Sequence, residues 1–233
     1  MGSRYLMPGH FVDFGVQSGY GHSVGGEHSI KGAWCPNCDK PLMLHMTLDA
    51  SDPALKLNRL GLSTIPLLYC SRCSLSWYDF TYVLKSETEI KLVEFFTGET
   101  NWDEWNSAVG VDVFPKQSCS FRPMPSKLQK LYDKLNDDEE LSERETRYVL
   151  KMTDVIGNII DVTNQVGGRS FLCQMLLDPW CVNCQKVGER NQAFFLASLT
   201  NVPKAGVVFS YDSIQIVFFF CPVCRSIKVT HSC

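Results

Sequence analysis

Four C-x-x-C pairs constrain the fold of this chain more than any other feature of its sequence. They contain eight of its eleven cysteines. A C-x-x-C turn directs two thiolates to one point, and two such turns complete the tetrahedral shell of four sulfurs that zinc accepts. We therefore predict two structural zinc ions per chain. The expected ligands are Cys35, Cys38, Cys70 and Cys73 in the first site and Cys181, Cys184, Cys221 and Cys224 in the second.

Other uses of these thiols stay open at the level of sequence. Four cysteines also suit an iron–sulfur cluster, whereas redox activity is typical of one isolated C-x-x-C near a helix N-terminus. A closed four-cysteine shell leaves no position for water, which disfavours catalytic zinc. His231 and Cys233 lie close enough to the last pair to replace one ligand, although a frayed terminus is the simpler interpretation. Cys119 and Cys173 have partly apolar neighbours and are interpreted as core residues.

The cysteine pairs belong to a longer motif that occurs twice. Residues 33–40 (AWCPNCDK) and 179–186 (PWCVNCQK) share the frame Trp-Cys-x-Asn-Cys-x-Lys, and Val-Gly-Gly precedes both. An apolar stretch follows the first pair of each half, and another leads into the second pair. Because order and spacing repeat together, we predict two copies of one module. Trp34 and Trp180 are expected to cover the two metal sites against the sheet.

Strand patterns dominate both halves of the chain, and helical patterns occupy the segment between them. Residues 76–84 alternate as in a half-buried strand. The central segment spaces its leucines as in helices, behind two capping boxes at Ser126/Gln129 and Ser142/Glu145. We predict an α+β, β-rich, internally duplicated fold with two antiparallel-sheet repeats, each with a four-cysteine zinc site. The predicted units are residues 1–121 for the first repeat, 122–160 for a helical connector and 161–233 for the second repeat.

Composition narrows the possible partners and the compartment. The chain has 233 residues, a formal net charge of −3 and a pI near 6.0. It therefore lacks the basic surplus that binding to a nucleic-acid backbone requires. No apolar run is long enough to cross a membrane, and the N-terminus has no apolar core of a signal peptide. We expect a cytoplasmic protein, in which thiols stay reduced and bind metal rather than form disulfides.

No catalytic motif is recognisable in the sequence. The five histidines are scattered, and neither a metalloprotease helix, a nucleophile elbow nor a phosphate-binding loop occurs. The glycine- and histidine-rich stretch 18–28 is interpreted as a flexible loop. We therefore expect a zinc-dependent protein-interaction module, not an enzyme, with a protein client or partner. The alternative is a nucleic-acid-binding zinc module, with Arg59, Arg72 or Lys91 beside the first site.

The paired Val-Gly-Gly and C-x-x-C motifs resemble a known superfamily. It joins the eukaryotic programmed cell death protein 2-like proteins with the bacterial YwqG-like proteins (domain of unknown function 1963). The stretch VGGEHSIKGAWCPNCDKPLMLHMTL is similar to the eukaryotic members, and QVGGRSFLCQ to the bacterial Gly-Gly element, with Ser170 where those members have proline. The resemblance implies a duplicated, β-rich fold with pseudo-twofold symmetry. For the eukaryotic branch it also implies a dedicated chaperone for a ribosomal protein.

Overall fold

The computed structural model describes residues 7–70, 80–95, 114–152, 164–169, 180–201 and 215–232. Residues 231 and 232 are described by their backbone alone. The strands of the first half are β1 (His10–Phe14), β2 (Ser23–Val24), β3 (Trp34–Cys35), β4 (Lys40–Pro41), β5 (Met43–Asp49), β6 (Thr64–Tyr69), β7 (Phe80–Ser86) and β8 (Glu89–Glu94). Those of the second half are β9 (Gln117–Pro123), β10 (Gln165–Val166), β11 (Phe194–Leu199), β12 (Gln215–Phe220) and β13 (Ser226–Ser232). The helices are η1 (Asn58–Leu60), α2 (Ser126–Asn136), α3 (Glu143–Met152) and α4 (Val182–Gln185).

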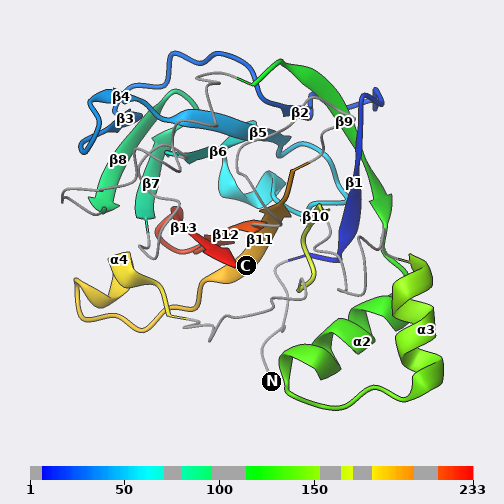
Figure 1. Cartoon of the computed structure of the whole chain (residues 1–233). Coiled ribbons are helices and arrows are strands. Elements are labelled where there is room, and N and C mark those ends of the chain that lie inside the picture. The colour runs from blue at the N-terminus through cyan, green and yellow to red at the C-terminus, as the bar shows by residue number, and fades with distance from the viewer. Residues whose placement is uncertain are drawn as a thin grey trace.

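One curled antiparallel sheet organises the molecule (Figure 1). Its strand order is β6-β5-β2-β9-β1-β10-β11-β12-β13-β7-β8, and β3 and β4 form a separate hairpin. The β-rich class is therefore confirmed, but the strands of both halves join one continuous sheet instead of one sheet for each half. Strands of the two halves pair where β9 lies between β2 and β1, where β1 pairs with β10, and where β7 pairs with β13. Because the sheet curls, β12 (QIVFFF) is buried along its whole length, which suits its β-branched and aromatic residues.

A tyrosine side chain joins the two ends of the curled sheet. Tyr82 on β7 is fully buried, and its hydroxyl donates to the Pro66 carbonyl of β6 at 2.9 Å. The same hydroxyl accepts from the Leu68 N–H of β6, also at 2.9 Å. The phenol therefore satisfies two backbone groups of β6 that no neighbouring strand reaches on that side. Burial raises the pKa of Tyr82 far above its usual value, so the phenol stays protonated and able to donate.

We predict that Tyr82→Phe lowers the free energy of unfolding by about 2–5 kcal/mol, because it leaves two buried backbone groups without a partner. Equilibrium urea unfolding of the metal-loaded protein measures the change. The matched control is Tyr20→Phe on an exposed loop, which should remain within about 0.5 kcal/mol of the parent. A loss at Tyr82 no larger than in the control would contradict the role given to its hydroxyl.

Two three-stranded parts of the sheet have the same hydrogen-bonding register. In β2-β5-β6, Val24 pairs with Met46, and β5 has a bulge at His45. In β10-β11-β12, Val166 pairs with Ala197, and β11 has a bulge one residue earlier. Both third strands end directly before a C-x-x-C pair, which begins at Cys70 or Cys221. The residue types of these strands do not align with one another, but their hydrogen-bonding patterns do.

The two Gly-Gly turns make corresponding contacts across the centre of the sheet. The first glycine of each turn donates to the bulged residue of the same half, from Gly25 to His45 and from Gly167 to Leu196. The second donates to the segment that leads into a central strand: from Gly26 to Phe114 before β9, and from Gly168 to Met7 before β1. The Gly-Gly turn of each half is therefore hydrogen-bonded to the segment just before the first strand of the other half.

All four of these glycines have positive φ, and the first of each pair also lies against backbone. A Cβ on Gly25 would lie 2.6 Å from the Pro115 carbonyl oxygen, and one on Gly167 would overlap the Pro8 carbonyl oxygen. We predict that Gly25→Ala and Gly167→Ala each lower the melting temperature by about 8 °C or more, from a loss of about 2–3 kcal/mol. Gly15→Ala is the control for φ alone, since that φ is +72° and its Cβ would meet open space. Equal losses at all three positions would show that the close approach is unimportant.

Helices α2 and α3 pack together against β1 (Figure 1). Their apolar stripes pack on Phe11 through residues that include Leu128, Tyr132 and Val149. The capping box at Ser142/Glu145 is confirmed, since the Ser142 N–H donates to Glu145 Oε2 at 2.9 Å. The box predicted at Ser126 is wrong: Pro125 is the N-cap and has no side-chain bond, and Gln129 bonds Arg169 instead. Among the described residues, no helix has the length and apolar character needed to cross a membrane.

Candidate metal centres

Four cysteines meet in the second half as the sequence predicts. Cys181 and Cys184 come from the turn before β11, and Cys221 and Cys224 from the turn between β12 and β13. All four sulfurs lie within 4.8 Å of one another. Cys181 Sγ lies 3.4 Å from Cys224 Sγ, and Cys184 Sγ lies 3.8 Å from Cys221 Sγ. A tetrahedral zinc with bonds of about 2.3 Å separates its sulfurs by about 3.8 Å, so these residues fit that ion.

Local hydrogen bonds give this second site its shape. The Cys181 N–H donates to the Asn191 carbonyl, and the one-turn helix α4 places Cys184 beside Cys181. In the opposite turn the Arg225 N–H donates to the Cys221 carbonyl, with Arg225 in the left-handed conformation at φ 58°. Backbone hydrogen bonds therefore help to close both turns.

A buried serine contacts two of the four sulfurs. Ser226 Oγ lies 3.0 Å from Cys181 Sγ and 3.2 Å from Cys224 Sγ. At Cys224 burial acts to raise the pKa, but hydrogen bonds from Ser226, Asn183 and Cys181 outweigh it and lower the pKa to about 7. Burial raises the pKa of Cys184 to about 11, and that of Cys221 still further. Four thiolates in so small a volume repel one another, so a divalent cation would favour their joint deprotonation.

We predict that Ser226→Ala weakens zinc binding at the second site by about 10–100-fold, the range typical of groups that bond to metal ligands. Competition against a chromophoric zinc chelator at pH 7 measures the affinity directly. Thr230→Ala further along β13 is the matched control and should leave it unchanged. If Ser226→Ala binds zinc as tightly as the parent chain, the hydroxyl does not support the thiolates.

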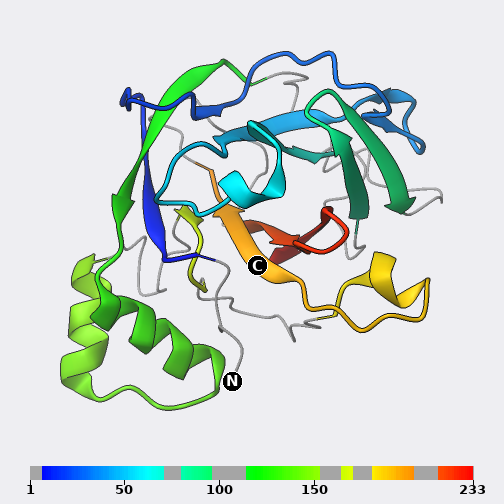
Figure 2. The same ribbon diagram turned by 180° about the vertical axis from the view of Figure 1, so that it is seen from behind.

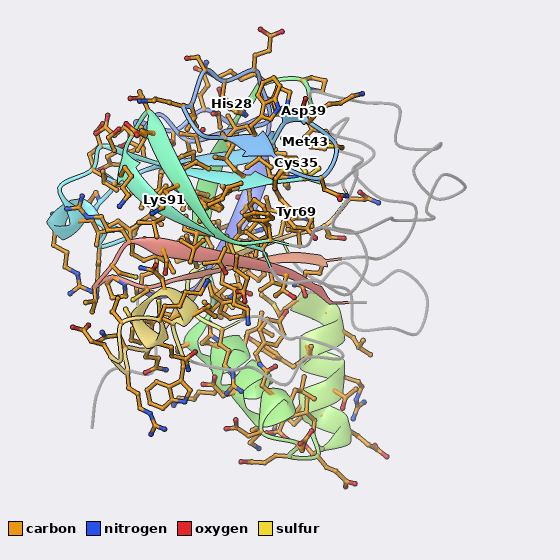
Figure 3. All side chains as sticks on the ribbon, turned by 90° about the vertical axis from the view of Figure 1, so that its left-hand side faces the viewer. His28, Cys35, Asp39, Met43, Tyr69 and Lys91 are labelled. Atoms are coloured by element: carbon orange, nitrogen blue, oxygen red, sulfur yellow. The ribbon has the colours of Figure 1, made fainter. Side chains whose placement is uncertain are left out.

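Three cysteines meet in the first half. Cys35 and Cys38 lie in the β3–β4 hairpin and Cys70 directly follows β6, with all three sulfurs within 4.8 Å of one another. Cys38 Sγ lies 3.7 Å from Cys70 Sγ. Figure 3 shows Cys35 and Asp39 close together on this hairpin, with Met43 beside them. The predicted fourth ligand, Cys73, lies outside the described residues, so the structure brings together three of the four.

The two metal-binding turns differ in local conformation despite their shared sequence frame. The first closes as a hairpin, in which the Asp39 N–H donates to the Cys35 carbonyl and Asp39 has φ 52°. The second continues into α4, and its connection to β11 is longer than that from the first turn to β5. Asn183 lies in α4, and Asp39 is the left-handed residue of the first turn. Neither asparagine of the shared frame, Asn37 or Asn183, has a positive φ.

Trp34 and Trp180 do not cover the metal sites, contrary to the sequence-based prediction. Trp34 is 50% exposed, and its indole N–H donates to Asp39 Oδ1 at 2.7 Å. Trp180 is 39% exposed, with the Arg190 guanidinium 5.9 Å from its ring centroid. Each precedes the first cysteine of its turn, in an extended bridge that directs the ring outward. Both turns thus present an aromatic ring to solvent.

Both turns lie at the same end of the molecule, on either side of the β7–β8 hairpin (Figures 1 and 2). Ile90 on β8 donates to the Lys31 carbonyl ahead of the first turn, at 2.9 Å. Lys186, just after α4, donates through Nζ to the Val93 carbonyl of β8 at 2.8 Å. Helices α2 and α3 lie at the opposite end in both views.

The other cysteine and histidine candidates have no shown role at these centres. Cys119 is a buried core residue, as predicted, and burial raises its pKa to about 12. Cys173 and Cys233 lie outside the described residues. For His231 the structure gives only the backbone, on β13. Ser226, the residue that sequence analysis missed, carries no motif, and only its place two residues after Cys224 could have indicated it.

Comparisons with protein-family models, with curated proteins and with solved structures found no match to this chain.

Proposed function

We propose that the chain is an internally duplicated protein-interaction module whose two structural zinc ions hold its binding surface in place. The matching registers, bulges and Gly-Gly contacts of the two halves support the duplication. In this proposal the second copy begins with β9, whose residues after Pro115 correspond to those after Pro8 in β1, earlier than the boundary at 161. Helices α2 and α3 are then an insertion between the first two strands of the second copy.

Zinc is the proposed ion because the ligand chemistry fits it best. The second site offers four sulfurs at tetrahedral separations, and the first offers three, with Cys73 proposed as the fourth. Such sites are closed and structural, so zinc would supply folding energy and no reaction. Free thiols belong in a reducing compartment, which agrees with a cytoplasmic location.

The carrying observation is the pair of exposed tryptophans at corresponding positions of the two metal-binding turns. Exposed tryptophans are enriched among residues that dominate binding energy in protein interfaces. Trp34 and Trp180 sit on turns fixed by the metal sites, at the same end of the molecule. We propose that they contact a protein client and that the chain acts as its dedicated binding partner or chaperone.

The proposal is tested by affinity purification of the tagged, zinc-loaded chain from cells of its source organism under reducing conditions. We expect one stoichiometric protein client, captured by the parent chain and lost with Trp34→Ala/Trp180→Ala. The control is Val16→Ala, which removes another exposed apolar side chain that belongs to neither turn. Metal content and melting temperature of the variants must match the parent. No client, or a client retained by the tryptophan variant, would contradict the proposal.

A further inference from the structure

Helices α2 and α3 lie between β9 and β10, and no helix lies between the corresponding strands of the first half, β1 and β2. In the second half, the connection from β9 to β10 carries both helices, which fold back onto β1 and bury Phe11. In the first half, the connection from β1 to β2 is only residues 15–22. By register, Ser118 on β9 corresponds to Phe11 on β1, because Ser118 pairs with Ser23 and Phe11 pairs with Gln165. Ser118 has no helix above it in the described structure.

A hollow of about 470 Å³ occupies this place. One wall is the short connection, with Gln17, Ser18 and Tyr20, and the other is the start of β9, with Lys116 and Ser118. The lining is mostly polar, unlike the apolar face that α2 and α3 bury in the second half. The hollow therefore suits a partner that brings hydrogen-bonding groups.

Hydrogen bonds to Asp49 and Asp52 hold the short connection in position. His22 Nδ1 accepts from the Asp49 N–H at 3.0 Å, and His22 Nε2 lies 2.9 Å from Asp52 Oδ2. Because Nδ1 is an acceptor, Nε2 carries the proton and donates to Asp52. The neighbouring Gly21 N–H donates to Asp49 Oδ2 at 2.8 Å. Both ring nitrogens are engaged, so His22 positions the wall and is not available as a base.

Lys116 gives the hollow its charge. It corresponds to Gly9 in the other half, where the absence of a side chain leaves room for the Gln129 amide of α2. The stem of Lys116 packs on Gly26, where a Cβ would lie 3.1–3.3 Å from three of its carbons. Lys116 is exposed, and no acidic side chain in the described parts of the chain pairs with it. Among the described residues that line the hollow, Lys116 is the one Lys, Arg, Asp or Glu.

We propose that this hollow, formed by residues 17–23 and 116–118, binds an acidic segment of the protein client. A client carboxylate pairs with Lys116, and the Gln17 amide and Ser118 hydroxyl add neutral hydrogen bonds. The client segment occupies the place that α2 fills in the second half. This inference rests on the proposed function, since it assigns a second contact to the same client.

The test uses a fluorescein-labelled octapeptide of alternating glutamate and alanine, titrated to 1 mM with the zinc-loaded full chain in low salt. We expect saturable binding that Lys116→Glu weakens about tenfold or more, as expected for loss of a charge-assisted bond. Ser118→Phe, which introduces into the hollow the residue type of Phe11 at the corresponding position of β1, should weaken peptide binding similarly. Lys130→Glu on the exposed face of α2 makes the same change in net charge and should have little effect. An equivalent lysine–alanine peptide should not bind.

Several outcomes would overturn the proposal. These are absence of binding at 1 mM, equal losses with Lys130→Glu, or a parent affinity in Lys116→Glu and Ser118→Phe. Displacement of the peptide by millimolar inorganic phosphate at unchanged ionic strength would assign the site to a small anion instead. Melting temperatures show whether each variant is folded. Because the tryptophan experiment uses a different surface, the hollow can fail this test while the client proposal stands.

Discussion

Removal of metal from this chain by a strong chelator is expected to unfold it cooperatively at room temperature. Zinc bound to a four-cysteine site contributes on the order of 10 kcal/mol at neutral pH, which is comparable to the whole stability of a typical domain. The sulfurs of the second site lie between β11, β12 and β13, and those of the first join the β3–β4 hairpin to the end of β6. Circular dichroism and the melting temperature, measured before and after chelation under reducing conditions, give the effect.

Cysteine variants separate the metal's contribution from that of the thiol itself. Cys221→Ser should lower the melting temperature by more than 15 °C, since loss of several kcal/mol is expected when a structural site is broken. Cys119→Ser is the control, because that cysteine is equally buried but lies outside both clusters. Its loss should be the few degrees typical of a polar atom placed in a core. A chelated, metal-free chain with unchanged spectrum and melting temperature would contradict the account.

Acid is expected to destabilise this chain through one core histidine. His45, at the bulge of β5, lies among the rings of Tyr69, Phe114 and Phe218, and burial lowers its pKa from 6.5 to about 3. The folded state therefore keeps His45 neutral between pH 6.5 and 3, whereas the unfolded chain takes up a proton there. The resulting stability is fully present above pH 6.5 and is lost as the pH falls, by about 1.4 kcal/mol for each pH unit.

Replacement of His45 by leucine, the residue at the corresponding bulge of the second half, is expected to remove this acid sensitivity. Leu196 occupies the corresponding bulge of β11 and is also buried, so His45→Leu should fold and lose that part of the acid sensitivity. The measurement is the difference in unfolding free energy between parent and variant at pH 7.5, 6.5 and 5.5. A difference that grows toward low pH is expected, because the other titrating groups are common to both chains. A difference that stays constant over this range would be inconsistent with a neutral buried His45.

The sequence indicated which cysteines meet in the two described clusters because that information is local. A C-x-x-C pair determines the conformation of its own turn. To predict that Cys181 lies near Cys221, it was enough to assign the last two pairs to the same site. The strand that leads into the last pair was equally clear, since residues 216–220 of β12 (IVFFF) are an unbroken apolar and aromatic run. The helical segment was found from its leucine spacing, although Pro125 displaced the expected cap at Ser126.

Features that depend on distant residues could not be read from the sequence. The joining of both halves into one sheet depends on β1 and β9, which share almost no residue types and are related only by pairing and by the Gly-Gly contacts. The outward orientation of Trp34 depends on the hairpin bridge to Pro41. The Tyr82 hydroxyl finds its partners only because the sheet curls until β7 meets β6.

The most direct test of this account is the metal content of the reduced, freshly purified chain, determined by inductively coupled plasma mass spectrometry against protein concentration from amino-acid analysis. We predict two zinc ions per chain, falling to one in Cys224→Ser and to one in Cys70→Ser. Loss of both ions in either single variant would differ from this expectation and would show that the two sites depend on one cooperative fold. A parent chain that contains no zinc, or iron in its place, would contradict the central claim.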